Sequence, residues 1–186
     1  MIAKNTLRVG IAGYGVVGKR RRHHIDLHPR METVAVSDRT YNGSGHLPDG
    51  IAFCNDYGDL LDYQLDALFV CLSNDVAADA TIRGLECGYH VFCEKPPSRN
   101  VDEMIRVMDC HNDHPELKLK YGFNHRYHDS VRDALGLVES GELGQVINLR
   151  GIYGKSKLIS FGRKSDWRTQ REIAGGGILL DQGIHM

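Results

Sequence analysis

A Gly-x-Gly-x-x-Gly pattern, formed by Gly13, Gly15 and Gly18, lies near the start of the chain between an apolar run and a helical segment. The apolar run, 7–12, is typical of a short buried strand. After such a strand, the first glycine permits a tight turn, the second lets the backbone approach a ligand, and the third allows close helix–strand contact. The helix N-terminus then presents unpaired N–H groups and the positive end of its dipole. The arrangement predicts a site for the diphosphate of a dinucleotide.

An acidic residue, Asp38, follows Gly18 by 20 residues (38 − 18) and ends a second apolar strand over 33–37. A carboxylate there accepts hydrogen bonds from the adenosine ribose and repels a 2′-phosphate, which favours NAD over NADP. The neighbouring Arg39 leaves the alternative open, because a cation can tolerate the phosphate or lie against the adenine. An Asp that only caps a loop is the other interpretation. We expect NAD as the cofactor.

Composition excludes several classes of partner. With 41% hydrophobic residues and a formal charge of −1, the 186-residue chain can bury a core and has no excess charge for nucleic acid. The basic run 19–22 forms no single face, because helical residues are spaced about 100° apart. The five cysteines include no Cys-x-x-Cys pair, which favours a reducing cytoplasm and predicts neither disulfides nor a metal site. We see no signal peptide or transmembrane run and expect no membrane partner.

The first 120 or so residues alternate strand and helix patterns. This predicts an α/β fold, a Rossmann-type doubly wound parallel sheet over 1–123. Strands are expected over 66–72, 89–93 and 117–123, a helix over 75–86, and a loop over 41–50. A further helix carries an apolar stripe at helical spacing that should face the core. Its members are Val101, Met104, Ile105 and Met108.

The pattern changes near Asn124, where we expect an α+β domain to begin and to occupy 124–186. A helix is predicted with His128, Val131, Leu135 and Val138 on one face, followed by a long β run over 145–153. About 60 residues are too few for a well-buried sheet domain. We therefore expect this second domain to be incomplete and the chain to be C-terminally truncated.

Three residues could carry chemistry. Lys95 follows the carboxyl end of a predicted parallel strand, where α/β sheets place their ligands, and its amine could stabilise negative charge on a substrate oxygen. Asp181 and His185 are four apart and would share a face on a helix, so the carboxylate could orient a general base. A surface lysine beside a turn and polar residues on a helix surface are the alternative interpretations.

These motifs resemble those of the NAD(P)-dependent oxidoreductases grouped around glucose–fructose oxidoreductase and inositol dehydrogenase, the Gfo/Idh/MocA family. The resemblance runs through essentially the whole chain. Its most specific motifs, taken together, are Glu-Lys-Pro at 94–96 and Asp-x-x-x-His at 181–185. It is carried by the glycine turn 13–18 and by the segments 93–97, 122–127, 167–168 and 175–185.

The resemblance implies hydride transfer between a nicotinamide and the hydroxyl or keto carbon of a sugar, sugar nucleotide or cyclitol. Lys95 would bridge cofactor and substrate, His185 would take the hydroxyl proton, and Asp181 would assist. Further cofactor contacts are implied at Tyr14, Val16, Val17, Leu72, Ser73, Asn74, Glu94, Trp167 and Arg168. Asp75 stands where many members carry a His, so no role is transferred to it.

The resemblance also implies a homo-oligomer formed through the second-domain sheet of the full-length protein. Two other functions stay open. One is a non-catalytic NAD-binding or sensing module, and the other is redox-assisted elimination with retained NAD.

Overall fold

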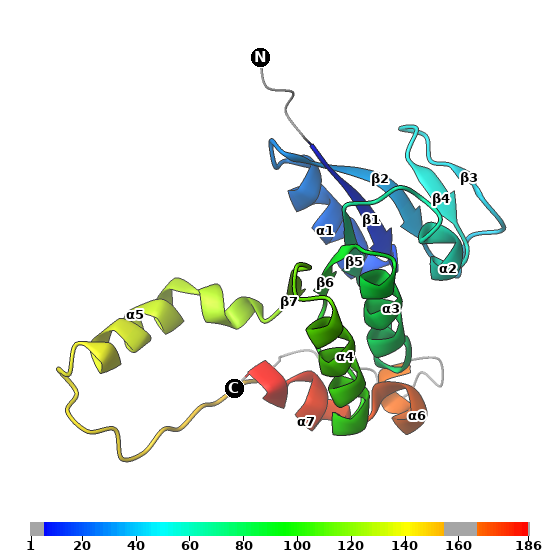
Figure 1. Ribbon diagram of the computed structural model, residues 1–186. Helices are drawn as coiled ribbons and strands as arrows, with labels where there is room; N and C mark the ends of the chain where they lie inside the picture. The colour runs from blue at the N-terminus through cyan, green and yellow to red at the C-terminus, as the bar shows by residue number, and fades with distance from the viewer. Residues whose placement is uncertain (1–5, 155–166, 186) are drawn as a thin grey trace.

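The structure, a computed structural model, describes residues 6–154 and 167–185. Its centre is a seven-stranded sheet in the order β3-β4-β2-β1-β5-β6-β7 (Figure 1). Every neighbouring pair is parallel except β3 and β4. The prediction of a doubly wound α/β fold is confirmed. The strands are β1 (Leu7–Ala12), β2 (Met31–Ser37), β3 (Gly45–His46), β4 (Ala52–Cys54), β5 (Ala67–Val70), β6 (His90–Cys93) and β7 (Leu119–Tyr121).

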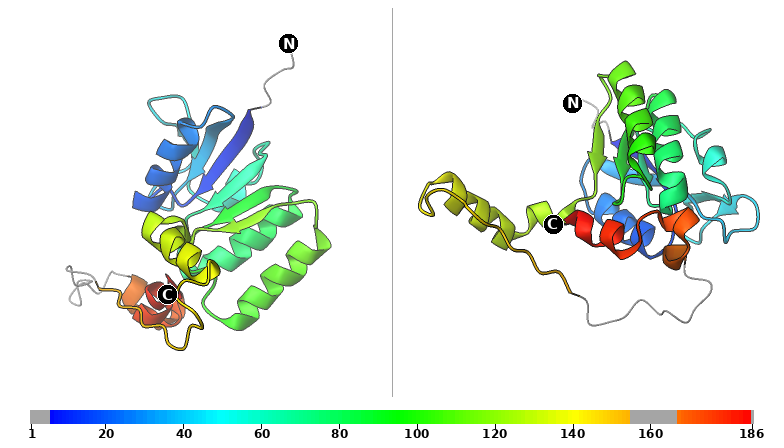
Figure 2. Two further views of the ribbon diagram at one scale, coloured as in Figure 1. Left: turned by 90° about the vertical axis from the view of Figure 1, so that its left-hand side faces the viewer. Right: turned by 90° about the horizontal axis from the view of Figure 1, so that it is seen from below.

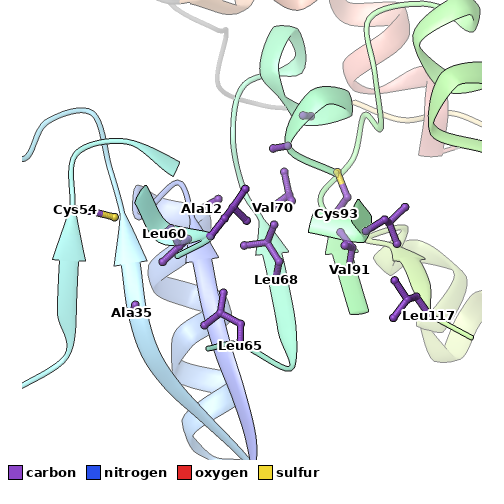
Figure 3. Close-up of a cluster of buried hydrophobic side chains, with 14 of the residues drawn as sticks. Ala12, Ala35, Cys54, Leu60, Leu65, Leu68, Val70, Val91, Cys93 and Leu117 are labelled. Atoms are coloured by element: carbon purple, nitrogen blue, oxygen red, sulfur yellow. The ribbon is translucent and has the colours of Figure 1, made fainter. Parts of the chain in front are cut away.

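Helices cover the sheet through two groups of buried apolar side chains. Helix α1 (Val16–Asp26) contributes Ile25 to a cluster with Val9 and Ile11. Helices α2 (Tyr57–Leu60) and α3 (Asn74–Glu86) contribute to a second cluster, drawn in Figure 3, which includes Leu60 and Leu68. Because the chain passes from β1 to β2 and, in the opposite direction, from β5 to β6, a crevice is expected where the carboxyl ends of β1 and β5 diverge.

Helix α4 (Val101–Asp113) packs beside α3, but with a different face from the one predicted. Val101, Ile105 and Met108 are exposed, and Val107 is the residue of this helix that is fully buried. The predicted stripe is therefore wrong. Polar residues of α4 form hydrogen bonds with nearby parts of the chain. For example, His111 Nε2 lies 3.2 Å from the Leu117 carbonyl oxygen. Apolar periodicity alone does not detect a packed face of this kind.

The segment 41–50 is not wholly a loop. Strand β3 lies within it and pairs antiparallel with β4. The turn that joins them is closed by a 2.8 Å hydrogen bond from Leu47 N–H to the Ile51 carbonyl, and Gly50 has φ +86°. The Pro48-Asp49-Gly50 sequence is a turn signal that could have revealed this hairpin.

The C-terminal part forms short helices. Helices α6 (Arg171–Ala174) and α7 (Gly177–Asp181) lie against the ends of the sheet's helices, whereas α5 (Asp129–Glu139) stands away from them (Figure 2). The β run predicted over 145–153 forms no strand. A lone strand has unpaired backbone groups and needs partners, and no described strand lies beside it. In the part of the chain that is described, no helix has the length and apolar character to span a membrane.

Candidate functional site

The turn between β1 and α1 divides the three glycines into two kinds. Gly13 has φ +92°, and a Cβ there would collide with the backbone of Cys71 at the end of β5. A Cβ on Gly18 would collide with the Gly13 carbonyl group. A Cβ on Gly15 would meet nothing within 4 Å. The first and third glycines therefore keep the turn tight, while Gly15, at the N-terminus of α1, borders open space.

The carboxyl end of β2 carries the predicted ribose-binding group. Asp38 is half-buried, and its Oδ1 accepts hydrogen bonds from Thr40 N–H at 3.0 Å and Thr40 Oγ at 2.7 Å. Arg39 is exposed beside it. Tyr14 is fixed by a 2.9 Å hydrogen bond from Arg22 Nη1 to its hydroxyl group. This end of the site thus presents the oriented carboxylate of Asp38 beside the exposed guanidinium group of Arg39.

A cavity of about 320 Å³ opens at the crevice between β1 and β5. Most of the residues predicted from the sequence to bind cofactor or act in catalysis line it, although Gly13, Tyr14, Gly18, Asp38, Arg39 and His185 do not. Cys71 and Pro96 line it without having been predicted. The lining residues are Gly15, Val16, Val17, Cys71, Leu72, Ser73, Asn74, Glu94, Lys95, Pro96, Trp167, Arg168 and Asp181.

Lys95 and Asp181 meet at this cavity from opposite ends of the chain. The Lys95 ammonium group donates to Asp181 Oδ1 at 2.7 Å and to the Asp181 carbonyl at 2.9 Å. The Lys95–Pro96 peptide bond is cis. Burial opposes ionisation of Asp181, but hydrogen bonds from Lys95 and from Gln182 outweigh it and hold the pKa of the carboxyl below its ordinary value. Both side chains are less than one-fifth exposed, at 19% and 18%, so the pair is a shielded ion pair.

The predicted helix face shared by Asp181 and His185 is not formed. Helix α7 ends at Asp181, and His185 lies in a separate 3-10 turn, Gly183–His185. The His185 ring instead stacks on His125, with ring centroids 4.1 Å apart. Burial, then the charges of His128 and Lys95, lower the pKa of His125. Glycines on both sides of α7 keep this segment too short for one continuous helix.

The loop after β5 joins the sheet to the C-terminal part. The Asn74 side chain is buried and donates to the Ala174 carbonyl at 2.9 Å, which ties α6 to the start of α3. Ser73 donates to Asp75 Oδ1 at 2.6 Å. Arg168 lies over the ring of Trp167, 4.5 Å from its centroid. The sequence did not suggest that Asn74 would hold two parts of the chain together, because its partner is 100 residues away.

No metal site is visible within residues 6–154 and 167–185, where His, Cys, Asp and Glu form no cluster with ligand spacing. All five cysteines are described and are free thiols. His90 has a structural contact instead, because its Nδ1 accepts a hydrogen bond from Lys118 N–H at 3.1 Å.

Two protein-family domains match this chain, one in each part of it. Residues 7–122 match an oxidoreductase family with an NAD-binding Rossmann fold, GFO/IDH/MocA, and residues 131–186 match the GFO/IDH/MocA C-terminal domain. The chain belongs to the GFO/IDH/MocA family. The family resemblance noted from the motifs is confirmed, and with it a fold that binds NAD(P).

Individual GFO/IDH/MocA proteins show the same relationship. The chain is 30% identical over 184 residues to an uncharacterized oxidoreductase, YrbE, of Bacillus subtilis, covering 95% of this chain and 50% of that protein. It is 29% identical to inositol 2-dehydrogenase of Salmonella typhimurium, covering 83% and 48%. The structure of scyllo-inositol dehydrogenase from Lactobacillus casei with NAD(H) and scyllo-inositol superposes with a TM-score of 0.66 at 25% identity, covering 75% and 42%. The chain spans about half the length of its curated relatives.

Proposed function

We propose that this chain provides the NAD site and the catalytic lysine of a dehydrogenase that acts on a CH–OH group of a sugar, sugar nucleotide or cyclitol. The observation that carries the proposal is the Lys95–Asp181 pair in the wall of the cavity beside the glycine turn. A family of NAD-binding oxidoreductases, with relatives named inositol 2-dehydrogenase and D-glucoside 3-dehydrogenase, supports it.

Lys95, His185 and Asp181 have different roles in the proposed reaction. When bound, the nicotinamide supplies the acceptor for the hydride of the carbinol carbon. Lys95, held as an ammonium by Asp181, donates a hydrogen bond to the substrate oxygen and stabilises its developing negative charge. His185 accepts the hydroxyl proton, and its ring is held in place by stacking on His125. Asp181, with its lowered pKa, stays ionised and positions Lys95 instead of accepting the proton.

The preferred cofactor in this proposal is NAD. This preference is supported by Asp38, which follows the carboxyl end of β2 and whose carboxylate is already oriented by Thr40. The backbone around Gly15, with the loop 72–74 opposite, would hold the diphosphate. Glu94, Trp167 and Arg168 would line the nicotinamide-side part of the same cavity.

Three broader expectations belong to the same proposal. Residues 1–123 would form the cofactor domain and 124–186 the start of the substrate domain, in keeping with the two separate family matches. A homo-oligomer would form through the second-domain sheet of a longer protein. The five free thiols favour a cytoplasmic location.

Titration of the protein with NADH, followed by a single-turnover assay with NAD and a panel of inositols and glucosides, tests the function. We expect saturable NADH binding and formation of NADH with at least one polyol. Lys95→Ala leaves Asp181 without its counter-charge, so we expect NADH binding to weaken by about tenfold and turnover to fall by about a thousandfold or more. Equal losses of binding and turnover would contradict the catalytic role of Lys95. Binding without any turnover would favour a sensing module, and product formation with cofactor that never exchanges would favour elimination.

A further inference from the structure

A second ion pair lies directly behind the Lys95 turn. Arg21 on α1 donates from Nε to Glu94 Oε1 at 2.6 Å, and its Nη2 contacts the same oxygen. The guanidinium also lies over the ring of Phe92, 4.8 Å from the ring centroid. The side chains of Arg21 and Glu94 are 29% and 15% exposed. The carboxylate is thus largely removed from water, with Arg21 as its counter-charge.

The surroundings of Glu94 are shaped to hold this carboxylate. A Cβ on Gly122 would lie 2.9 Å from Glu94 Oε2, so the glycine at the end of β7 leaves the space that the carboxylate fills. The Lys95 N–H points at the same oxygen at 3.4 Å. Glu94 is therefore attached to the backbone that carries Lys95, and it lines the cavity together with Asp181.

Two carboxylates in the wall of a cavity would repel an anionic diphosphate unless each is neutralised. Lys95 neutralises the charge of Asp181, and Arg21 neutralises the charge of Glu94. We propose that Arg21 is a positioning residue of the cofactor site, which neutralises and anchors Glu94 so that the cavity accepts the diphosphate of the cofactor and Lys95 keeps its place. This inference rests on the proposed NAD-binding function.

The test measures NADH affinity for a set of matched variants of the protein, with thermal unfolding as a check of folding. Arg21→Gln removes the counter-charge, and we expect about tenfold weaker binding at neutral pH. Arg20→Gln removes the same charge from an exposed position of the same helix and should change affinity by about twofold or less. Arg21→Gln/Glu94→Gln removes both charges and should bind NADH at least about threefold more tightly than Arg21→Gln does.

The salt dependence separates this role from a merely structural one. In Arg21→Gln the unpaired Glu94 carboxylate should repel the diphosphate, and salt screens such repulsion, so the loss of NADH affinity relative to the wild type should shrink as the salt concentration rises from about 0.01 M to about 1 M. The double variant should lack this recovery. Cys71, Cys93 and Lys95 also lie near Glu94, and Asp181 and Arg168 line the same cavity. All of these groups remain in the double variant, and burial raises the pKa of both thiols.

Each outcome decides between the claims. A wild type that does not bind NADH would overturn the proposed function and this inference with it. If the wild type binds but Arg21→Gln matches it, or Arg20→Gln loses as much, the inference alone is wrong. Failure of the double variant to recover would also overturn it. Should Arg21→Gln not fold, Arg21→Lys decides: it retains the positive charge and should bind NADH within about threefold of the wild type, and a large loss would refute the charge argument.

Discussion

Asp181 is held by hydrogen bonds on both of its carboxylate oxygens, from Lys95 on Oδ1 and from Gln182 on Oδ2. Its pKa is lowered from 3.8, so the ionised form stabilises the folded state at pH values above about 4 and this contribution is lost as pH falls. We expect Asp181→Asn to lower the free energy of unfolding by about 1–3 kcal/mol at pH 7. The difference from the wild type should shrink between about pH 5 and pH 3.

Denaturant unfolding at several pH values measures this difference. Asp109→Asn, at an exposed position on α4, is the control and should change the free energy of unfolding by about 0.5 kcal/mol or less. A difference between the wild type and Asp181→Asn that stays constant down to pH 3 would contradict the assignment of the lowered pKa to this ion pair.

Asp38 carries the cofactor choice at the other end of the site. Its Oδ1 is already engaged by Thr40, so the side chain is oriented before any ligand binds. Asp38→Ala should weaken NADH binding by about tenfold, because hydrogen bonds to a charged acceptor are lost, and should reduce the discrimination against NADPH. Parallel titrations with NADH and NADPH measure both effects. Unchanged affinities for the two cofactors would show that Asp38 does not contact the ribose.

In the turn between β1 and α1, substitutions at different glycines should affect stability and ligand binding separately. Gly18→Ala places a Cβ against the Gly13 carbonyl and should cost about 2–4 kcal/mol of stability, because backbone has to move. Gly15→Ala meets nothing within 4 Å and should leave stability within about 0.5 kcal/mol while weakening NADH binding. Thermal unfolding and NADH titration of both variants test this. A stable Gly18→Ala, or a Gly15→Ala that binds normally, would contradict it.

Elements whose residues interact mainly with their sequence neighbours were predictable. Strands β1, β5, β6 and β7 lie within the expected ranges, and β2 begins two residues before its expected start, because each is a short apolar run that ends in turn residues. The packed face of α4 was not predictable, since it depends on α3 as a neighbour and on hydrogen bonds such as that of His111. The segment 145–153 fails for a related reason. Its β pattern specifies a strand, but no described strand is available to pair with it.

At the scale of the whole molecule, sequence patterns identified most of the residues that line the cavity, but they did not predict which of these residues contact one another. Lys95 and Asp181 were both named as catalytic candidates from the sequence, but the ion pair that the structure forms between them was not foreseen. Asp181 was expected to meet His185 along a helix that ends too early. Contacts between distant segments depend on the packing of α6 and α7 against the sheet's helices, and local patterns carry no information on that packing.

The exposure of α5 leads to a prediction for the molecule as a whole. Every residue of this helix is exposed, including Val131, Leu135 and Val138, so no core contact with the rest of the described chain stabilises it. An 11-residue helix without packing is marginal in water. We expect its amides to exchange with deuterium about a hundredfold or more faster than those of α3, which buries Ala80 and Leu85. Hydrogen–deuterium exchange at several protein concentrations tests this. Equal protection of α5 and α3 at every concentration would contradict it, whereas protection that grows with concentration would show that a second copy of the chain covers the apolar face.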